Sequence, residues 1–361
     1  MTEAERKQII ALVQREVVPA IGCTEPIAVA LCVAKATETL GAKPEKIDVL
    51  LSANILKNAM GVGIPGTGMI GLPIAIALGA LIGKSEYQLE VLKDSNPAAV
   101  EEGKRFIGEK RIDISLKKNI TEKLYIEVCC KSGGNKATAI IAGGHTTFIY
   151  IARNGDVLLN KQSAGCGEEE AQVAGLTLRK VYDFAMNAPL DEIRFILETA
   201  RLNKAAAERS FDGNYGHGLG RMLRGNYEHK ILGDSVFSHI LSYTSGACDA
   251  RMAGAMIPVM SNSGSGNQGI SATLPVLVYA EENGKSEEEL IRALMLSHLT
   301  VRFRILWSTS SSIIPSTEVT QRFSIAMMAE RTAVETPVVT FKAQLGLAPS
   351  QIIPVRLAIM F

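Results

Sequence analysis

The stretch AIGCTEPIA, Ala20–Ala28, places a cysteine in a break between two apolar helical runs. Before it, apolar residues recur at helical spacing, and after it Pro26 suits the first turn of a second helix, which Thr24 or Glu25 can cap. Cys23 is therefore expected just before a helix N-terminus, where the positive end of the helix dipole favours a thiolate. The alternative is a small buried cysteine that only packs in the helix turn.

The length and the net charge of the chain restrict the classes of protein to which it can belong. The chain has 361 residues, 47% hydrophobic and 21% charged, with a formal net charge of +1. This is enough sequence for two domains, and the near-zero charge offers no general attraction to nucleic acid or an anionic membrane. The start, MTEAERKQII, lacks a signal-peptide pattern, and the apolar run Gly68–Gly83 is too short for a membrane span, which favours a buried helix. We expect a cytoplasmic protein that binds neither nucleic acid nor membrane.

The cysteines show no zinc-like spacing, and a chain without a secretory signal has little need of disulfides. Cys129 and Cys130 are expected on opposite faces of one strand, and Cys32 in the core of a helix. The six cysteines are Cys23, Cys32, Cys129, Cys130, Cys166 and Cys248.

The apolar pattern changes along the chain. Residues 1–165 mix helical and strand-like segments, and the strand-like run contains Gly-Gly and Asn-Gly hairpin signals. Residues 166–301 are helical in pattern, and Ser286 with Glu289 forms a capping box. The predicted fold is α+β: N-terminal helices with a mainly antiparallel sheet, followed by a largely helical region that carries the catalysis.

Two Gly-rich segments interrupt these patterns. The first, Asn54–Pro73, contains a formal G-x-G-x-x-G, but no strand directly precedes it, so a dinucleotide site is disfavoured. A loop that admits a small ligand is favoured there, with Lys57 and Asn58 able to meet a carboxylate. The second, Ser245–Val276, contains the loop SNSGSGNQG (Ser261–Gly269), which offers many donors and exposed backbone N–H groups, as an anion site does; a flexible linker is the alternative.

The sequence does not assign a functional role to three more polar residues. Arg251 can orient a substrate or pair with Asp249 on the surface. His298 is expected to be a satisfied helix histidine, and His145 marks a turn between strands.

Five blocks of sequence resemble the L-cysteine desulfidase family, which is related to the catalytic chain of iron–sulfur L-serine dehydratases. They run in order from about residue 10 to residue 301: PAIGCTEPIAVAL, ILKNAMGVGIPGTGMIGLPIAIALGAL, DEIRFILETARLN, ARMAGAMIPVMSNSGSGNQGISATLPV and LIRALMLSHL. The resemblance implies a cytoplasmic lyase that converts L-cysteine to sulfide, ammonia and pyruvate with a four-iron four-sulfur cluster and without pyridoxal phosphate.

The resemblance also implies a role for Cys23, and the two Gly-rich loops suggest the residues that bind the substrate. Cys23 is one of the family's four cysteines, as a cluster ligand or as the base near the cluster, with Glu25 as its catalytic neighbour. The residues expected to bind the amino acid substrate are Thr24, Lys57, Asn58, Gly66, Thr67, Gly68, Arg251, Ser261, Asn262, Ser263, Ser265 and Asn267.

The resemblance ends at Val301. The family's other three cysteines follow the helix that contains His298, whereas residues 302–361 have no cysteine, no aspartate and one glycine. This abrupt change predicts a reading-frame shift and a disordered tail, with a diverged C-terminal domain as the alternative. On this basis the chain lacks three of the family's cluster ligands and is expected to be inactive in this truncated form.

Two other functions remain open: a dehydratase of L-serine or another β-substituted amino acid, and a cluster-free protein that binds a small amino acid. A homo-oligomer is expected only from the general frequency of such assemblies among enzymes of this size.

Overall fold

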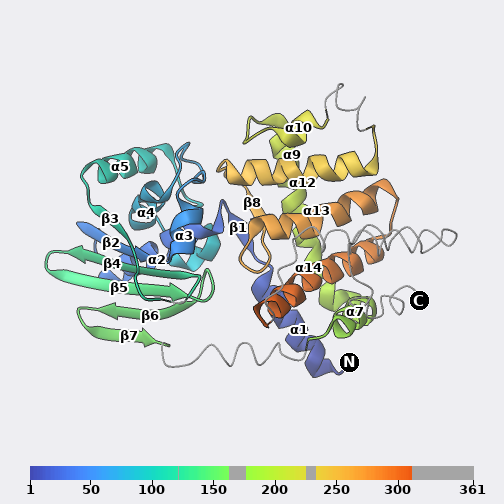
Figure 1. The fold of residues 1–361 in the computed structure, drawn as a ribbon, viewed down its shortest axis with the longest axis horizontal. Coiled ribbons are helices and arrows are strands. Elements are labelled where there is room, and N and C mark those ends of the chain that lie inside the picture. Colours follow the sequence, from blue (N-terminus) through green and yellow to red (C-terminus); the bar gives the residue numbers. More distant parts are fainter. Residues whose placement is uncertain (121, 162–175, 225–232, 311–361) are drawn as a thin grey trace.

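This computed structural model describes residues 1–120, 122–161, 176–224 and 233–310, which form an α+β fold in two parts (Figure 1). A sheet with helices packed against it forms one part, and helices form the other. The predicted fold class is therefore confirmed.

Within the described ranges, the main sheet has six strands in the order β3-β2-β4-β5-β6-β7. Neighbouring strands are antiparallel except β2 and β3, which are parallel. The Gly-Gly and Asn-Gly signals lie at the β4–β5 and β6–β7 turns, where Gly134 and Asn154 have positive φ. The strands are β2 (Lys46–Leu51), β3 (Ile112–Leu116), β4 (Tyr125–Ser132), β5 (Asn135–Ala142), β6 (Phe148–Arg153) and β7 (Asp156–Asn160).

The helix after Cys23 is the centre of the first core. It is α2 (Thr24–Leu40), and it packs between the sheet and α4, where a Cβ on Gly79 would lie only 2.6 Å from the Ala30 carbonyl oxygen. As predicted, Cys32 is buried in this core, and Cys130 is buried while Cys129 is half-buried. The other helices here are α3 (Ala53–Ala59), α4 (Leu72–Leu81), the 3₁₀ helix η1 (Ser85–Glu90) and α5 (Pro97–Gly108).

A second hydrophobic core lies among the helices of the other part. Ile9 and Val13 of α1 belong to it, so the first helix packs with the helical part although the sheet follows it in sequence. The helices are α1 (Glu3–Glu16), α7 (Leu178–Asn187), α8 (Leu190–Ile193), η2 (Arg194–Ile196), α9 (Leu197–Asp212), α10 (Leu219–Met222), α12 (Val236–Met252), α13 (Gly266–Glu282) and α14 (Glu287–Ser310).

Helix α14 begins at the predicted capping box, where Glu289 N–H donates to Ser286 Oγ at 3.3 Å and Ser286 N–H donates to Glu289 Oε2 at 2.9 Å. The helix continues past Val301 to Ser310, so the change in residue usage does not coincide with a helix end. The rest of the predicted tail, and Cys166, lie outside the described residues.

A short two-stranded sheet joins the two parts and was not predicted. Strand β1 (Pro19–Ile21) pairs antiparallel with β8 (Pro258–Met260), and both lie between the two parts in Figure 1. The loop before α4 adds two backbone bonds, from Gly63 N–H to Met252 O and from Gly66 N–H to Gly254 O, both 3.1 Å. Both predicted Gly-rich segments therefore meet at this junction.

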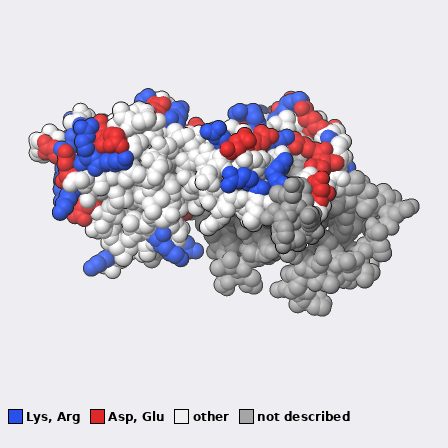
Figure 2. All heavy atoms as spheres, turned by 90° about the horizontal axis from the view of Figure 1, so that it is seen from above, with Lys and Arg blue, Asp and Glu red and all other residues white. Residues whose placement is uncertain are grey.

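Charged side chains of both signs are mixed on the face shown in Figure 2. No helix among the described residues is long and apolar enough to cross a membrane.

Candidate functional site

Cys23 lies directly before α2, as the sequence predicts, but Cys23 itself is the N-cap residue, because Thr24 and Glu25 already belong to the helix. The residue before Cys23 must be glycine, because Gly22 has φ +78° and a Cβ there would lie 2.4 Å from the Pro65 ring. Cys23 Sγ donates a hydrogen bond to Glu25 Oε2 at 3.0 Å, and Thr24 Oγ1 donates to the same oxygen at 3.2 Å. The predicted pair Cys23 and Glu25 is thus in direct contact.

The expectation that Cys23 is a thiolate is wrong for this arrangement. Burial raises the pKa of the Cys23 thiol to about 12; the charge of Arg251 opposes this effect, and the Glu25 carboxylate adds to it. For Glu25, burial acts to raise the pKa, but hydrogen bonds, that from Cys23 foremost, and the charge of His145 leave the pKa below its usual value. Desolvation and the neighbouring carboxylate therefore outweigh the helix dipole.

Arg251, near the end of α12, is buried with only 3% of its surface exposed. Its Nη1 donates to Asn267 Oδ1 at 2.9 Å, but its buried Nε has no hydrogen-bond partner in the part of the chain that the structure describes. Asp249 does not pair with it, since the Asp249 carboxylate accepts from the backbone N–H groups of His217 and Leu219 at 3.3 and 2.9 Å. Among the described residues, Arg251 is a buried guanidinium without an ion pair.

His145 lies in the turn between β5 and β6, and sequence reasoning gave it no functional role. Its buried Nε2 has no partner among the described residues, and its ring lies against Gly264, where a Cβ would be 2.3 Å from Nδ1. Burial lowers the pKa of His145; the Glu25 carboxylate opposes this effect and the charge of Arg251 adds to it. The glycines opposite His145 and Arg251 were the available sequence signal, but a lone sequence does not show what they face.

We call Cys23, Glu25, His145, Arg251 and Asn267 the junction site. They come from α2, the β5–β6 turn, α12 and the start of α13. The charge of Arg251 acts on Cys23 and His145, and Glu25 and His145 act on each other, which places these groups close together. The site offers a carboxylate, a thiol, an imidazole whose pKa lies below its usual value, and a guanidinium.

Other predicted residues of the SNSGSGNQG loop have partners within the protein. Ser261 Oγ donates to Val18 O at 2.6 Å, Ser263 Oγ donates to Asn262 Oδ1 at 2.9 Å, and Ser265 is the N-cap of α13. Asn262 Nδ2 donates to His298 Nδ1 at 3.0 Å. These side chains shape the loop.

His298 is a satisfied helix histidine, as predicted. Since Asn262 Nδ2 can only donate, His298 Nδ1 accepts, and Nε2–H donates to Thr273 Oγ1 at 3.1 Å. Asn203 Nδ2 donates to the same hydroxyl at 2.9 Å. Burial lowers the pKa of His298 to about 3, so the imidazole is neutral. We call Asn203, Asn262, Thr273 and His298 the His298 network.

The first Gly-rich segment contributes less side-chain chemistry. Asn58 Nδ2 reaches Glu25 Oε1 at 3.5 Å, while Lys57 is exposed and has no hydrogen bond or ion pair with a described residue. Thr67 Oγ1 donates to Ile64 O at 2.8 Å and closes the loop, in which Gly66 and Gly68 have φ of +69° and +64°.

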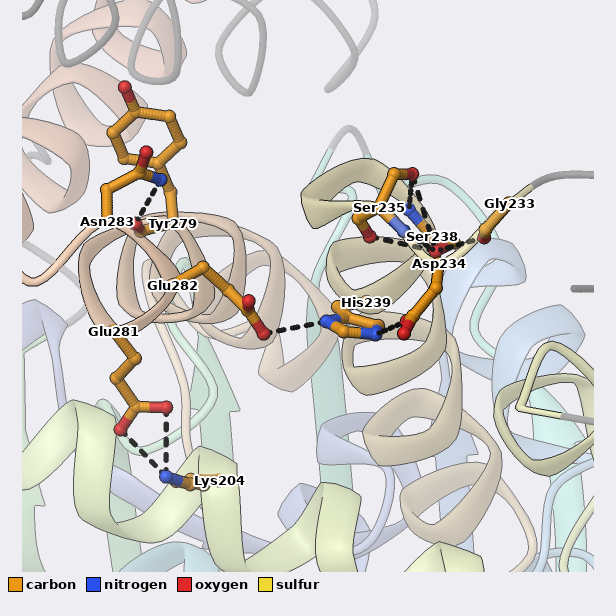
Figure 3. A network of polar contacts seen from close by, with 10 residues as sticks. All are labelled: Lys204, Gly233, Asp234, Ser235, Ser238, His239, Tyr279, Glu281, Glu282 and Asn283. Carbon is orange, nitrogen blue, oxygen red and sulfur yellow. Dashed lines mark hydrogen bonds and ion pairs between the residues drawn. The ribbon is translucent and has the colours of Figure 1, made fainter.

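A separate polar cluster lies on the surface at the start of α12 (Figure 3). The His239 ring stands between Asp234 Oδ1 and Glu282 Oε1, each 2.6 Å from a ring nitrogen, and the bond to Glu282 contributes most to raising the pKa of His239. Every polar end of this imidazole is occupied, which is typical of a surface ion pair rather than a ligand site.

The model of the serine dehydratase alpha chain family matches residues 86–313. A UPF0597 protein of Bacteroides fragilis is 83% identical over 301 residues, which are 83% of this chain and 70% of that protein. UPF0597 proteins of Bacteroides thetaiotaomicron and Chromobacterium violaceum are 79% and 46% identical, over 83% and 81% of this chain and 70% and 68% of theirs. The chain belongs to the serine dehydratase-related family. No solved structure matches it.

The serine dehydratase alpha chain family is generally iron–sulfur dependent. In this member, no group of three or more His, Cys, Asp or Glu side chains within the described ranges is placed to hold a metal ion. Cys248 also lies within the influence of Arg251, but burial raises its pKa to about 11. The described residues therefore do not supply the set of thiolate ligands that a four-iron cluster requires.

Proposed function

We propose that the junction site serves an L-cysteine desulfidase-like β-elimination, which yields sulfide, ammonia and pyruvate from L-cysteine. The observation that carries the proposal is the buried guanidinium of Arg251, which stands beside the Cys23–Glu25 pair without an anionic partner among the described residues. A buried charge is costly unless it is paired. The carboxylate of a small amino acid would provide that pairing, and family membership supports the reaction class.

The elimination breaks the Cα–H and Cβ–S bonds, forms a Cα=Cβ double bond and releases hydrosulfide; water then displaces ammonia to leave pyruvate. We assign proton transfer to Glu25, the carboxylate at this position, and assign to Cys23 the hydrogen bond that orients it. Thr24 and Asn58 hold the same carboxylate.

The two Gly-rich loops supply the walls of the proposed site. We assign one wall to the backbone of Gly66, Thr67 and Gly68 and the other to the loop that contains Ser261, Asn262, Ser263 and Ser265, and we assign the exposed Lys57 to the rim.

Two alternatives have specific support. The matching family model is that of a serine dehydratase, which favours L-serine or another β-substituted amino acid as substrate. The lack of metal-ligand groups among the described residues favours a cluster-free amino-acid-binding protein.

Product assays under anaerobic conditions separate these functions. Protein reconstituted with iron and sulfide is incubated with L-cysteine or L-serine, and sulfide and pyruvate are measured. Higher pyruvate formation from L-serine identifies a dehydratase. Stabilisation of chelator-treated protein by either amino acid, without product, identifies a binding protein.

Variants connect the result to the site. Cys23→Ser and Arg251→Lys should remove most activity, whereas Cys129→Ser, on the sheet, should leave it unchanged. If the wild-type chain forms no product and is not stabilised by either amino acid, the proposal is contradicted.

A further inference from the structure

Two buried nitrogen atoms at the junction site lack a hydrogen-bond partner among the described residues: Arg251 Nε and His145 Nε2. Both side chains lie against glycines of one loop, since a Cβ on Gly266 would be 2.2 Å from Arg251 Nε and a Cβ on Gly264 would be 2.3 Å from His145 Nδ1. Buried polar atoms in proteins are nearly always satisfied. Two unpaired nitrogen atoms that lie against the same loop therefore indicate one hydrogen-bond acceptor, absent here, that both nitrogens can share.

The two side chains lie against close neighbours of one loop, because Gly264 and Gly266 are separated by a single residue. A carboxylate has two oxygens, and each can accept an N–H···O bond of about 2.9 Å, so one carboxylate can serve two donors that lie near the same loop. Asn267 already fixes the other side of the guanidinium through Nη1, so Arg251 is held in place before a ligand arrives.

We propose that His145 Nε2 and Arg251 Nε together form a two-point receptor for the α-carboxylate of the amino acid, with Gly264 and Gly266 as its floor. This receptor rests on the proposed function and adds a specificity-determining residue from the sheet part of the fold. The ligand then bridges the two parts of the molecule.

Two charged groups act on His145: the Glu25 carboxylate on α2 and the Arg251 guanidinium on α12. The ligand's carboxylate pairs with Arg251, and Glu25 faces its ammonium group. The receptor accordingly selects a molecule with an amine and a carboxylate on the same carbon.

The test is a calorimetric titration of the chelator-treated full chain with L-serine and with ethanolamine, which lacks the carboxylate. L-Serine should bind and ethanolamine should not. His145→Ala should weaken L-serine binding about tenfold or more, while His145→Gln, whose amide still donates, should keep most of the affinity. His217→Ala, at an exposed histidine of another loop, is the matched control and should bind like the wild type.

The outcomes separate the two proposals. If L-serine binding needs Arg251 but is unchanged in His145→Ala, the receptor is wrong and the proposed function stands. If neither L-cysteine nor L-serine binds the wild-type chain, the proposed function fails and the receptor fails with it.

A second measurement covers the case in which His145→Ala does not fold. The chain has five histidines, so its imidazole ¹⁵N spectrum is simple. L-Serine, but not ethanolamine, should shift the Nε2 resonance that disappears in His145→Gln. An unshifted resonance in the presence of bound L-serine overturns the receptor.

Discussion

The His298 network and the junction site are two buried polar clusters built around the same loop, and they differ in how completely their hydrogen bonds are made. In the His298 network both ring nitrogens have partners, Asn262 Nδ2 at 3.0 Å and Thr273 Oγ1 at 3.1 Å. In the junction site, Arg251 Nε and His145 Nε2 have none among the described residues. The difference teaches that buried polarity alone does not indicate function; unmet hydrogen-bonding capacity does.

The strongest test of the comparison changes two glycines of the shared loop. In Gly269→Ala the Cβ would lie 1.9 Å from the Met260 backbone oxygen, so we expect a loss of about 3 kcal/mol or more in the free energy of unfolding. Gly266→Ala meets the Arg251 side chain instead and should impair ligand binding more than stability. Urea unfolding and L-serine titration measure both effects. Gly108→Ala is the control, because a Cβ there has no neighbour within 4 Å among the described residues. Equal destabilisation by Gly269→Ala and Gly266→Ala would break the comparison.

The next largest effect is expected from Asn203→Ala. Its amide accepts from Met260 N–H at 2.8 Å and donates to Thr273 Oγ1 at 2.9 Å, so truncation leaves buried groups unsatisfied and should cost about 2 to 3 kcal/mol in urea unfolding. Asn187→Ala, on an exposed helix surface, is the control and should change stability by less than about 1 kcal/mol. A loss as small as that of the control would show that the network does not hold the fold.

Protonation of His298 gives a pH-dependent version of the same test. Its folded pKa of about 3 lies below the unfolded value near 6.5, so its contribution is complete above about pH 6.5 and is lost as pH falls toward 3. The limiting slope is about 1.4 kcal/mol per pH unit. Urea unfolding of wild type and His298→Gln between pH 7 and pH 4 isolates this term as the difference between their slopes. Parallel slopes would contradict a neutral, buried His298.

The smallest effect on stability is expected at the junction site itself. Arg251→Met removes a buried charge that has no ion pair among the described residues, so stability should stay the same or rise by about 1 kcal/mol, while stabilisation by L-serine disappears. Thermal melts with and without L-serine provide the measurement. A large loss of stability in the ligand-free variant would instead place Arg251 among the residues that hold the fold.

Local sequence signals predicted most of the fold. Hairpin glycines, the Ser286–Glu289 capping box and the alternation around Cys129 and Cys130 all reflect interactions between near neighbours in sequence. The strands β1 and β8 escaped prediction because each has only three residues and exists through its pairing with the other. The parallel pairing of β2 with β3 likewise depends on contacts between segments that are distant in sequence, so local patterns do not predict it.

The candidate site was predictable only in part. The GCTEP motif correctly predicted that Cys23 precedes a helix, but its ionisation depends on burial and on Glu25, which a helix-dipole argument does not include. The sequence left two roles open for Arg251, a surface ion pair with Asp249 or the orientation of a substrate. Its burial rules out the surface ion pair. His145 was missed because the glycines before it indicate only a turn between strands, and its neighbours in space, Glu25 and Arg251, come from distant segments.

The pairing of β1 with β8 also has a consequence for the order of events during synthesis. Ser261 Oγ and Val18 O, just beyond the two strands, are bonded although they lie 243 residues apart in sequence. Contacts of such separation form late, because the intervening chain must first be ordered. On the ribosome, the sheet core can be complete before β8 has been made. At that stage Cys23 still lacks its neighbours from α12 and α13. The junction site should therefore be among the last features of the protein to mature, and an N-terminal fragment that stops short of β8 should fold its sheet without acquiring the site.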